Sequence, residues 1–448
     1  MNTIASLHAH FNDDSDSAAA LVERQIARVT DPAGEGSRAF LSLDQAAVKH
    51  AAQTSQQRMK AGSARPLEGI TISIKDLFDV KGEVTGAGST VLRSRPAATE
   101  DCPAVARLRD AGAITFGRNN TVEFAYSGVG INPHFGTPRN VWGRTADGGG
   151  RVPGGSSSGG GVAVADGMVV AALGSDTGGS VRLPAALNGV CGFKPTAVRV
   201  PIVGAIPLSV SLDSVGPIAN SVDCCARIDA VLAGETYTPS PLRSLRGVRL
   251  LKPVSLIWRE LDPDVEASVS AATEKLRAAG AEIVETPLPL LDELFDRPGL
   301  TGSEAFDWHA ANVNVNGIGY DPRVWQRMLL GRDVTRGAYT ALIAYRRFWI
   351  DRMNIALAGF DAVVCPTVAC IAPEIAPLVG DDALFFKTNA RILRNTAWVN
   401  FLDGCALTMP CQTPGDAPVG LQLVGVHDQD HAILGLGLAC EAALTASN

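Results

Sequence analysis

The chain has 448 residues and a formal net charge of −7 at pH 7, with 46% hydrophobic and 19% charged residues. This apolar content supplies a large buried core and excludes an intrinsically disordered chain. The acidic balance does not predict a direct nucleic-acid interface, because such interfaces need clustered basic residues.

The cysteines and the first residues indicate a cellular compartment. Nine cysteines are scattered along the chain without a C-x-x-C pair, which favours reduced thiols over a disulfide framework. Met1 to Ala18 lacks the basic and apolar segments of a secretory signal. The longest nearly apolar stretch, Val162 to Leu173, is too short to span a bilayer. We therefore expect a cytoplasmic protein without membrane contact.

The first half of the chain changes from helical to strand-like patterns. Asp16 and Ser17 are capping residues, and the apolar residues that follow share one helical face. Further along, apolar residues alternate with polar ones up to Lys75, which is typical of a strand. In chain order we expect helices over 18–29 and 43–61, a strand over 69–74, a helix over 104–111 after Pro103, and a strand over 113–117. Such alternation predicts an α/β fold.

The remainder of the chain continues this pattern. We expect a small-residue helix over 161–165, strands over 168–173, 248–251, 283–285 and 362–365, and helices over 264–279 and 339–358. The polar, proline-containing stretch Gly234 to Arg246 is a candidate boundary. The predicted organisation is an N-terminal helical region over 1–64, a catalytic core over 65–233, and a C-terminal part over 234–448 that completes the same body.

Two blocks rich in glycine and serine carry the candidate chemistry. The first is Pro153 to Gly161, and the second, Gly174 to Pro184, directly follows a predicted buried strand. Open α/β sheets place their sites at such strand ends. Gly178 and Gly179 allow the backbone to approach a ligand closely. Successive N–H groups here suit either an oxyanion hole or a phosphate.

The spacing of the two blocks, together with the upstream lysine, resembles the amidase signature family. Ser156 lies in the first block, Ser180 follows 24 positions later, and Lys75 ends the strand before them. The segments 69–79, 117–140, 189–196 and 418–425 also resemble the core of that family. The resemblance implies a single compact α/β body with a large mixed central sheet flanked by helices on both faces.

The resemblance also implies a role for each site residue. Ser180 is the expected nucleophile, Ser156, after a cis peptide bond, the expected proton relay, and Lys75 the expected base. The remaining implied residues are Thr177, Gly178, Gly179 and Ser180 as oxyanion-hole donors and Ser157, Asp176 and Arg182 as supporting groups. The implied activity is hydrolysis of a small-molecule amide to an acid and ammonia or an amine through an acyl-enzyme. Members of the family often form homodimers.

A lysine can act as a base only when it is neutral. Lowering its pKa from about 10.4 to near 7 disfavours the charged form by roughly 4–5 kcal/mol. Burial of Lys75 behind the glycine-rich loops is the expected cause. The alternative is a surface lysine paired with Asp76 or Asp79.

Two departures from the family pattern concern the first block and the loop before it. Ser158 and Gly160 stand where the family often has Gly and Ser. The loop Gly143 to Arg151 is about five residues longer than usual and is expected to border the site.

Several other functions are compatible with parts of the sequence. Gly155 to Gly159 matches G-x-S-x-G, which would make Ser157 an α/β-hydrolase nucleophile with His309, His427 or His431 as its base, but no strand precedes it. The glutaminase (A) component of aminoacyl-tRNA amidotransferases has the same triad and works in a tRNA-binding complex. A catalytically inactive binding protein on this scaffold is an alternative of another class.

Metal and nucleotide motifs are absent from the sequence. It contains no H-E-x-x-H and no P-loop, and His427 and His431 form only an i, i+4 pair near the end. We therefore expect neither a metal nor a cofactor.

The acyl pocket is expected to include Glu123 to Tyr126 and the aromatic residues Trp308, Tyr320 and Trp325, for which core packing is the alternative. Arg332 and Arg336 are candidates for binding a substrate carboxylate, although solvated surface charge is the more ordinary interpretation. The identity of the substrate is not predicted.

Overall fold

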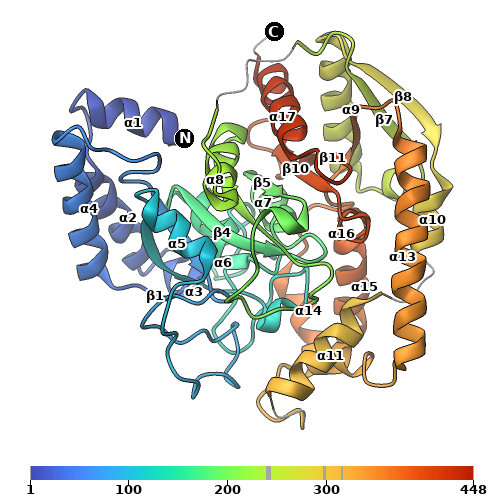
Figure 1. Cartoon of the computed structure of the whole chain (residues 1–448), viewed down its shortest axis with the longest axis horizontal. Helices are drawn as coiled ribbons and strands as arrows, with labels where there is room; N and C mark the ends of the chain where they lie inside the picture. The colour runs from blue at the N-terminus through green and yellow to red at the C-terminus, as the bar shows by residue number, and fades with distance from the viewer. Residues whose placement is uncertain (1, 239–243, 296–298, 314–315, 447–448) are drawn as a thin grey trace.

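A mixed sheet runs through the whole molecule (Figure 1). The computed structural model describes residues 2–238, 244–295, 299–313 and 316–446. Within these residues the sheet has 11 strands in the order β1-β3-β2-β4-β6-β5-β10-β11-β9-β7-β8. The strands are β1 Phe40–Ser42, β2 Thr71–Lys75, β3 Ile114–Asn119, β4 Ala171–Asp176, β5 Cys191–Lys194, β6 Ser214–Ala219, β7 Arg249–Val254, β8 Glu282–Pro287, β9 Ala362–Pro366, β10 Cys405–Pro410 and β11 Gly420–Gly425.

Parallel pairs lie toward the two ends of this sheet and antiparallel pairs at its centre, apart from the edge strand β1, which pairs antiparallel with β3. β2 pairs in parallel with β3 and β4, and β7 pairs in parallel with β8 and β9. The strands β4, β6, β5, β10, β11 and β9 join through antiparallel ladders. Because β5 pairs with β10, the N-terminal and C-terminal parts of the chain share one continuous sheet.

Helices cover both faces of the sheet, as the resemblance implies. α17 contacts both α8 and α9 beside β6, β10 and β11, whereas α6 and α7 form a second group on β4 and β5. The longer helices are α1 Ile4–Asn12, α2 Ala18–Thr30, α4 Gln45–Lys60, α5 Pro103–Asp110, α6 Ser158–Ala165, α8 Val222–Ala233, α9 Pro263–Ala278, α11 Thr301–Asn312, α12 Pro322–Leu329, α13 Arg336–Leu357, α15 Asp382–Leu393 and α17 Asp430–Thr445. The short helices are α3 Gly36–Ala39, α7 Arg182–Leu187, α10 Pro289–Phe295, α14 Ile375–Gly380 and α16 Ala397–Leu402.

Local sequence signals explain most helix positions. The hydroxyl of Ser17 accepts a hydrogen bond from the Ala20 amide and so caps α2, whose predicted apolar face is buried. Asp44 caps α4 in the same way. The predicted helices over 264–279 and 339–358 correspond to α9 and α13, and the second begins three residues earlier than expected because Thr335 caps it.

Two boundaries near the glycine-rich blocks differ from the sequence prediction. α6 begins at Ser158 rather than at residue 161, so its first turn includes Gly159, where a Cβ would lie 2.2 Å from the Ala39 carbonyl oxygen. The strand expected over 168–173 is β4, Ala171–Asp176, so it carries the polar residues Ser175 and Asp176 into the interior. Hydrophobicity alone did not mark these residues as strand, because their burial depends on hydrogen bonds.

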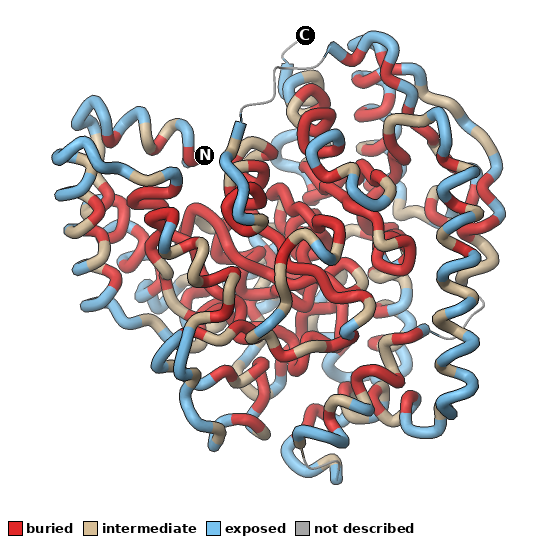
Figure 2. Tube along the Cα trace, viewed as in Figure 1, coloured by how far each residue is buried: buried red, intermediate tan, exposed pale blue. Residues whose placement is uncertain are grey.

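The buried residues lie mainly in the central sheet and in the helices packed against it. Figure 2 shows buried residues concentrated in the sheet and in the helices against it, while α4 and α13 expose their outer sides. All nine cysteines are unpaired, and eight of them are buried. Among the helices described, none is both long enough and apolar enough to traverse a lipid bilayer.

Candidate active site

Lys75, the last residue of β2, is buried and faces two serine hydroxyls. Lys75 is only 1% exposed. The Nζ atom lies 2.7 Å from Ser156 Oγ and 2.9 Å from Ser175 Oγ. Its neighbour Asp76 pairs instead with Arg118, at 3.0 Å. Lys75 is therefore not a surface lysine held by an adjacent carboxylate.

The surroundings of Lys75 favour its neutral form. Burial lowers the pKa of Lys75 to about 7, although the carboxylates of Asp176 and Asp213 act in the opposite direction. A second buried lysine, Lys194, has its Nζ on the carbonyl oxygens of Pro195 and Gly404. Because carbonyl groups carry no exchangeable proton, only Lys75 of these two is placed to exchange a proton with a hydroxyl group.

The backbone around Ser156 brings the two glycine-rich blocks together. The Gly155–Ser156 peptide bond is cis. The Ser156 carbonyl accepts hydrogen bonds from the Val122 amide at 3.1 Å and the Thr121 hydroxyl at 2.9 Å. The next amide, that of Ser157, donates to the carbonyl of Ser180 at 3.2 Å. Ser156 thus contacts Lys75 through its side chain, and its neighbour Ser157 contacts Ser180 through the main chain.

Asp176 and Arg182, both in the second block, form a buried ion pair. The guanidinium donates through Nη2 to Asp176 Oδ1 and through Nε to Oδ2, both at 2.9 Å. Burial by itself raises the pKa of Asp176, but the charge and hydrogen bonds of Arg182 outweigh it and hold the pKa well below its usual value. Arg182 also donates to Gln422 and Asn400, each at 2.8 Å. The pair therefore links the second block to β11 and α16.

Replacing Arg182 by methionine is expected to lower the free energy of unfolding by about 3–5 kcal/mol, because Asp176 is left as an uncompensated buried charge. The denaturation midpoint in urea measures this loss. The matched control is Arg332→Met, which removes an arginine from a solvent-exposed pair with Asp333 and should leave the midpoint unchanged. Equal midpoints for the two variants would contradict the structural role of the buried pair.

The loop Thr177 to Ser180 is fixed by several side chains. Thr177 Oγ1 donates to Asp213 Oδ1 at 2.5 Å, and Thr396 Oγ1 donates to the Gly178 carbonyl at 2.5 Å. Gly179 has a φ of +132°, and a Cβ there would lie 2.3 Å from Thr396 Oγ1, so only glycine fits. These hydrogen bonds and the close approach at Gly179 together hold the loop in place.

The amides of this loop have different surroundings. The Gly179 N–H donates to Asp176 Oδ1 at 2.8 Å, so the structure uses this expected oxyanion donor to brace the loop. Thr177, Gly178 and Ser180 line a cavity, and their amides have no hydrogen-bond partner within the described residues. These three amides, rather than all four, are available to a ligand.

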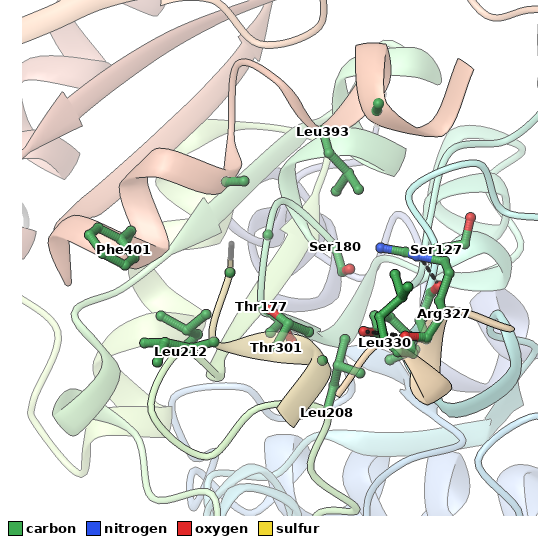
Figure 3. A pocket seen from close by; sticks show the side chains of 18 of the residues that line it. Ser127, Thr177, Ser180, Leu208, Leu212, Thr301, Arg327, Leu330, Leu393 and Phe401 are labelled. Carbon is green, nitrogen blue, oxygen red and sulfur yellow. Dashed lines mark hydrogen bonds between the residues drawn. The ribbon is translucent and has the colours of Figure 1, made fainter. Parts of the chain in front are cut away.

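The cavity above Ser180 has a volume of about 500 Å³ (Figure 3). Its walls are mostly apolar and include Leu208, Leu212, Leu330, Leu393 and Phe401. Three groups of the site were not predicted from the sequence: Arg327 and Arg394 of the lining, and the hydroxyl of Ser175 beside Lys75. No motif marks the two arginines, because they come from separate elements that meet the site only in the fold, whereas Ser175 belongs to the second block and was open to prediction.

Part of the predicted pocket lies elsewhere. Ala125 and Tyr126 line the cavity. Glu123 instead accepts hydrogen bonds from Ser89 at 2.7 Å and the Asp321 amide at 2.7 Å. The expected aromatic residues form a packed cluster in which Tyr320 stacks on Phe124 at 5.4 Å and contacts Trp325 at 5.2 Å, with Trp308 beside His309. Core packing, the alternative interpretation, therefore describes them.

The remaining expected groups also lie outside the cavity lining. Arg332 and Arg336 are exposed at the surface. The long loop over 143–151 contributes no lining residue; its Arg144 pairs with Asp166 at 2.8 Å.

The histidines of the α/β-hydrolase alternative contact other residues than Ser157. His309 bonds to Tyr320 Oη at 2.9 Å, His427 to Asp403 at 3.0 Å, and His431 pairs with Glu235 at 3.1 Å. Within the described part of the chain, the Ser157 hydroxyl makes only a long contact, 3.5 Å, to the Ser175 carbonyl. In the ranges that the structure covers, no three His, Cys, Asp or Glu side chains gather as metal ligands.

Known proteins share this architecture. A family model described as Amidase matches residues 20–434. The chain belongs to the Amidase family. Among curated relatives of this chain, the 2-amino-5-chloromuconic acid deaminase of Comamonas testosteroni is 36% identical over 91% of this chain and 88% of the relative. The A component of the glutamyl-tRNA(Gln) amidotransferase of Roseiflexus castenholzii is 34% identical over 89% and 87%, respectively. A crystal structure of an amidase superposes with a TM-score of 0.86 at 32% identity, covering 98% of this chain and 99% of the other.

Proposed function

We propose that this protein is a stand-alone amidase that hydrolyses a carboxylic amide to an acid and ammonia or an amine through Ser180. The single observation that carries the proposal is the contact between Lys75 Nζ and the Ser156 hydroxyl. Burial lowers the pKa of Lys75 to about 7, and the neighbouring cavity is lined by Ser180 and by amides without a partner among the described residues. A serine hydroxyl is a weak nucleophile and needs such a positioned base.

Acylation begins with attack of Ser180 Oγ on the amide carbon. The Ser180 proton passes to Ser156, whose own proton passes to Lys75 Nζ. The amides of Thr177, Gly178 and Ser180 stabilise the negative oxygen of the tetrahedral intermediate. As the C–N bond breaks, the proton returns through Ser156 to the leaving nitrogen, and the acyl group stays on Ser180.

Deacylation repeats these steps with water as the nucleophile. Water loses its proton to Ser156 and Lys75, attacks the ester carbon, and the Ser180–carbon bond breaks as the proton returns to Ser180. The hydroxyl of Ser175 accepts a second hydrogen bond from Lys75 Nζ, at 2.9 Å, and so helps to hold it in contact with Ser156. Hydrolysis in this scheme needs no metal or cofactor.

Ammonia release from a panel of aliphatic, aromatic and carboxylated amides by the purified single chain tests the proposal. The name of the Comamonas relative gives a carboxylic acid as its substrate, so carboxylated compounds belong in the panel. Turnover by the chain alone supports the proposal. Absence of turnover across the panel, with glutamine hydrolysed only after partner proteins are added, would favour the second candidate below.

The second candidate is the glutaminase component of an amidotransferase, which the similarity to the Roseiflexus protein favours. Copurification of this chain with partner proteins distinguishes it from a stand-alone amidase. A catalytically inactive binding protein is less compatible with the site, because Lys75, Ser156 and Ser180 are all present with Lys75 in contact with Ser156.

The rate of hydrolysis is expected to rise with pH through about 7. The pKa of Lys75 is lowered by burial to about 7, and only its neutral form accepts a proton. Below this pH Lys75 is charged, so kcat/KM should fall about tenfold per pH unit, and above it kcat/KM should level off. Initial rates between pH 5 and 9 with a neutral amide measure the profile.

Asp213→Asn provides an internal check of this profile. The charge of Asp213 raises the pKa of Lys75, so its removal should move the acidic limb to lower pH. A limb that stays in place, or moves to higher pH, would show that a group other than Lys75 controls the rate.

A further inference from the structure

A second, much smaller cavity shares part of its wall with the large one. Its volume is about 10 Å³. Thr177 and Leu208, which are labelled in Figure 3, line both cavities. The polar lining of the small cavity also includes Ser175 and Asp213. A buried water needs about 10–15 Å³ and two or more polar partners, so this cavity suits a single water.

The hydroxyl of Ser175 connects Lys75 to the small cavity. Its oxygen accepts a hydrogen bond from Lys75 Nζ at 2.9 Å. Ser175 is only 8% exposed, and its hydroxyl donates to no acceptor among the described residues. A buried hydroxyl group needs an acceptor for its own proton. Ser175 therefore has a donor left for a group in the small cavity.

Asp213 supplies an acceptor in the same cavity. Its carboxylate accepts hydrogen bonds from the Thr177 hydroxyl at 2.5 Å and from the amides of Leu208 and Ser209 at 3.0 and 3.1 Å. An ionised carboxylate has about four acceptor positions, so these three donors leave one position for a water.

We propose that one water in this cavity accepts a hydrogen bond from Ser175 and donates one to Asp213, and that Asp213 thereby acts as a positioning residue for the base. The inference rests on the proposed amidase function. Every hydrogen bond of the resulting chain then has the same direction: Ser180 donates to Ser156, Ser156 to Lys75, Lys75 to Ser175, Ser175 to the water, and the water to Asp213.

This direction decides whether Lys75 accepts a proton from Ser156. A neutral Nζ has a single lone pair, and a Ser175 hydroxyl that donated to it would block it. Because Ser175 donates to the water instead, the lone pair stays available to Ser156. No proton passes to Asp213: the proton from Ser180 stays on Lys75 until it returns through Ser156 to the leaving nitrogen. Meanwhile the negative charge of Asp213 stabilises the ammonium group of Lys75.

A double-mutant cycle tests the chain with an amide that the unmodified protein hydrolyses. It compares Asp213→Asn, Ser175→Ala and the double variant at pH 9, where Lys75 is neutral in each. An asparagine has one acceptor oxygen fewer, so Asp213→Asn should lower kcat by about 10–100-fold with little change in KM. In the Ser175→Ala background the same change should cost no more than about threefold, because the chain is already broken.

A structural role of Asp213, or an effect of its charge through space, does not depend on the Ser175 hydroxyl. An equal loss of kcat in both backgrounds would therefore overturn the inference. Asp333→Asn is the matched control, because Asp333 is an exposed aspartate paired with Arg332, and it should leave kcat unchanged.

Val215→Ile tests the water without changing either polar residue. Val215 pairs with Ser175 in the β4–β6 ladder and lines the same cavity. The added methyl group should displace the water and lower kcat at pH 9 by about tenfold. Full activity in a variant whose crystal structure shows this methyl group in the cavity would overturn the inference, even if Asp213→Asn fails to fold.

The water itself separates this inference from the proposed function. A high-resolution crystal structure should show one water within about 3.0 Å of both Ser175 Oγ and a carboxylate oxygen of Asp213. If amides are hydrolysed and no water lies there, the inference fails and the amidase function stands. If the water is present but no amide is hydrolysed, the amidase function fails. The same double-mutant cycle, measured by fluorophosphonate labelling of Ser180, then decides whether Asp213 positions the base.

Discussion

Replacing Ser180 by alanine is expected to abolish amide hydrolysis, with a fall in kcat of about 10⁶-fold. Ser180 lines the cavity, and its hydroxyl is the group that forms the acyl bond in the proposed mechanism. The remaining site can bind the amide and stabilise an oxyanion, but it has no nucleophile to attack the carbonyl. Ammonia release over long incubations measures the residual rate.

The variant must retain its fold for this result to be informative. The Ser180 side chain makes no hydrogen bond within the described residues. The thermal unfolding midpoint of Ser180→Ala should therefore match that of the unmodified protein. Ser157→Ala, in the first block, provides a comparison and separates Ser180 from the α/β-hydrolase alternative. A Ser180→Ala variant with near-normal turnover, or a Ser157→Ala variant without any, would contradict the assignment of the nucleophile.

Replacing Lys75 by alanine is expected to lower kcat by about 10³–10⁴-fold, because the base is removed while the nucleophile and the oxyanion donors remain. KM should change little, since Lys75 does not line the cavity. The acidic limb of the pH profile near 7 should also disappear from the residual activity. Steady-state kinetics between pH 5 and 9 measure all three effects.

Lys49→Ala is the matched control, because Lys49 is a half-exposed lysine of α4 that pairs with Glu23. It should leave kcat and the pH profile unchanged. Near-full activity of Lys75→Ala at pH 7 would show that the base is another group.

The sequence predicted those parts of the molecule that depend on local patterns. The capped, amphipathic α2 and the alternating strand that ends at Lys75 lie where expected, and the family and fold implied by the serine blocks are confirmed. In α2 the side-chain period itself selects the buried face, whereas β2 is buried on both faces and the alternation marks only its position.

Features that depend on distant contacts were not predictable in this way. Asp213 and Thr396 fix the loop at Thr177 and Gly178 from positions 36 and 218 residues away. Arg327 meets Tyr126 across 201 residues of sequence. No periodicity encodes such pairings, and for the same reason the aromatic residues expected in the pocket pack into the core instead.

The central claim, that neutral Lys75 activates Ser180 through Ser156, is tested most directly by the rate at which a fluorophosphonate labels the protein, with the modified residue located by peptide mass spectrometry. The account predicts a single label on Ser180, with a rate that rises through pH 7 and falls strongly in Lys75→Ala. A label on another residue, or labelling of Ser180 at a rate that depends on neither pH nor Lys75, would contradict it.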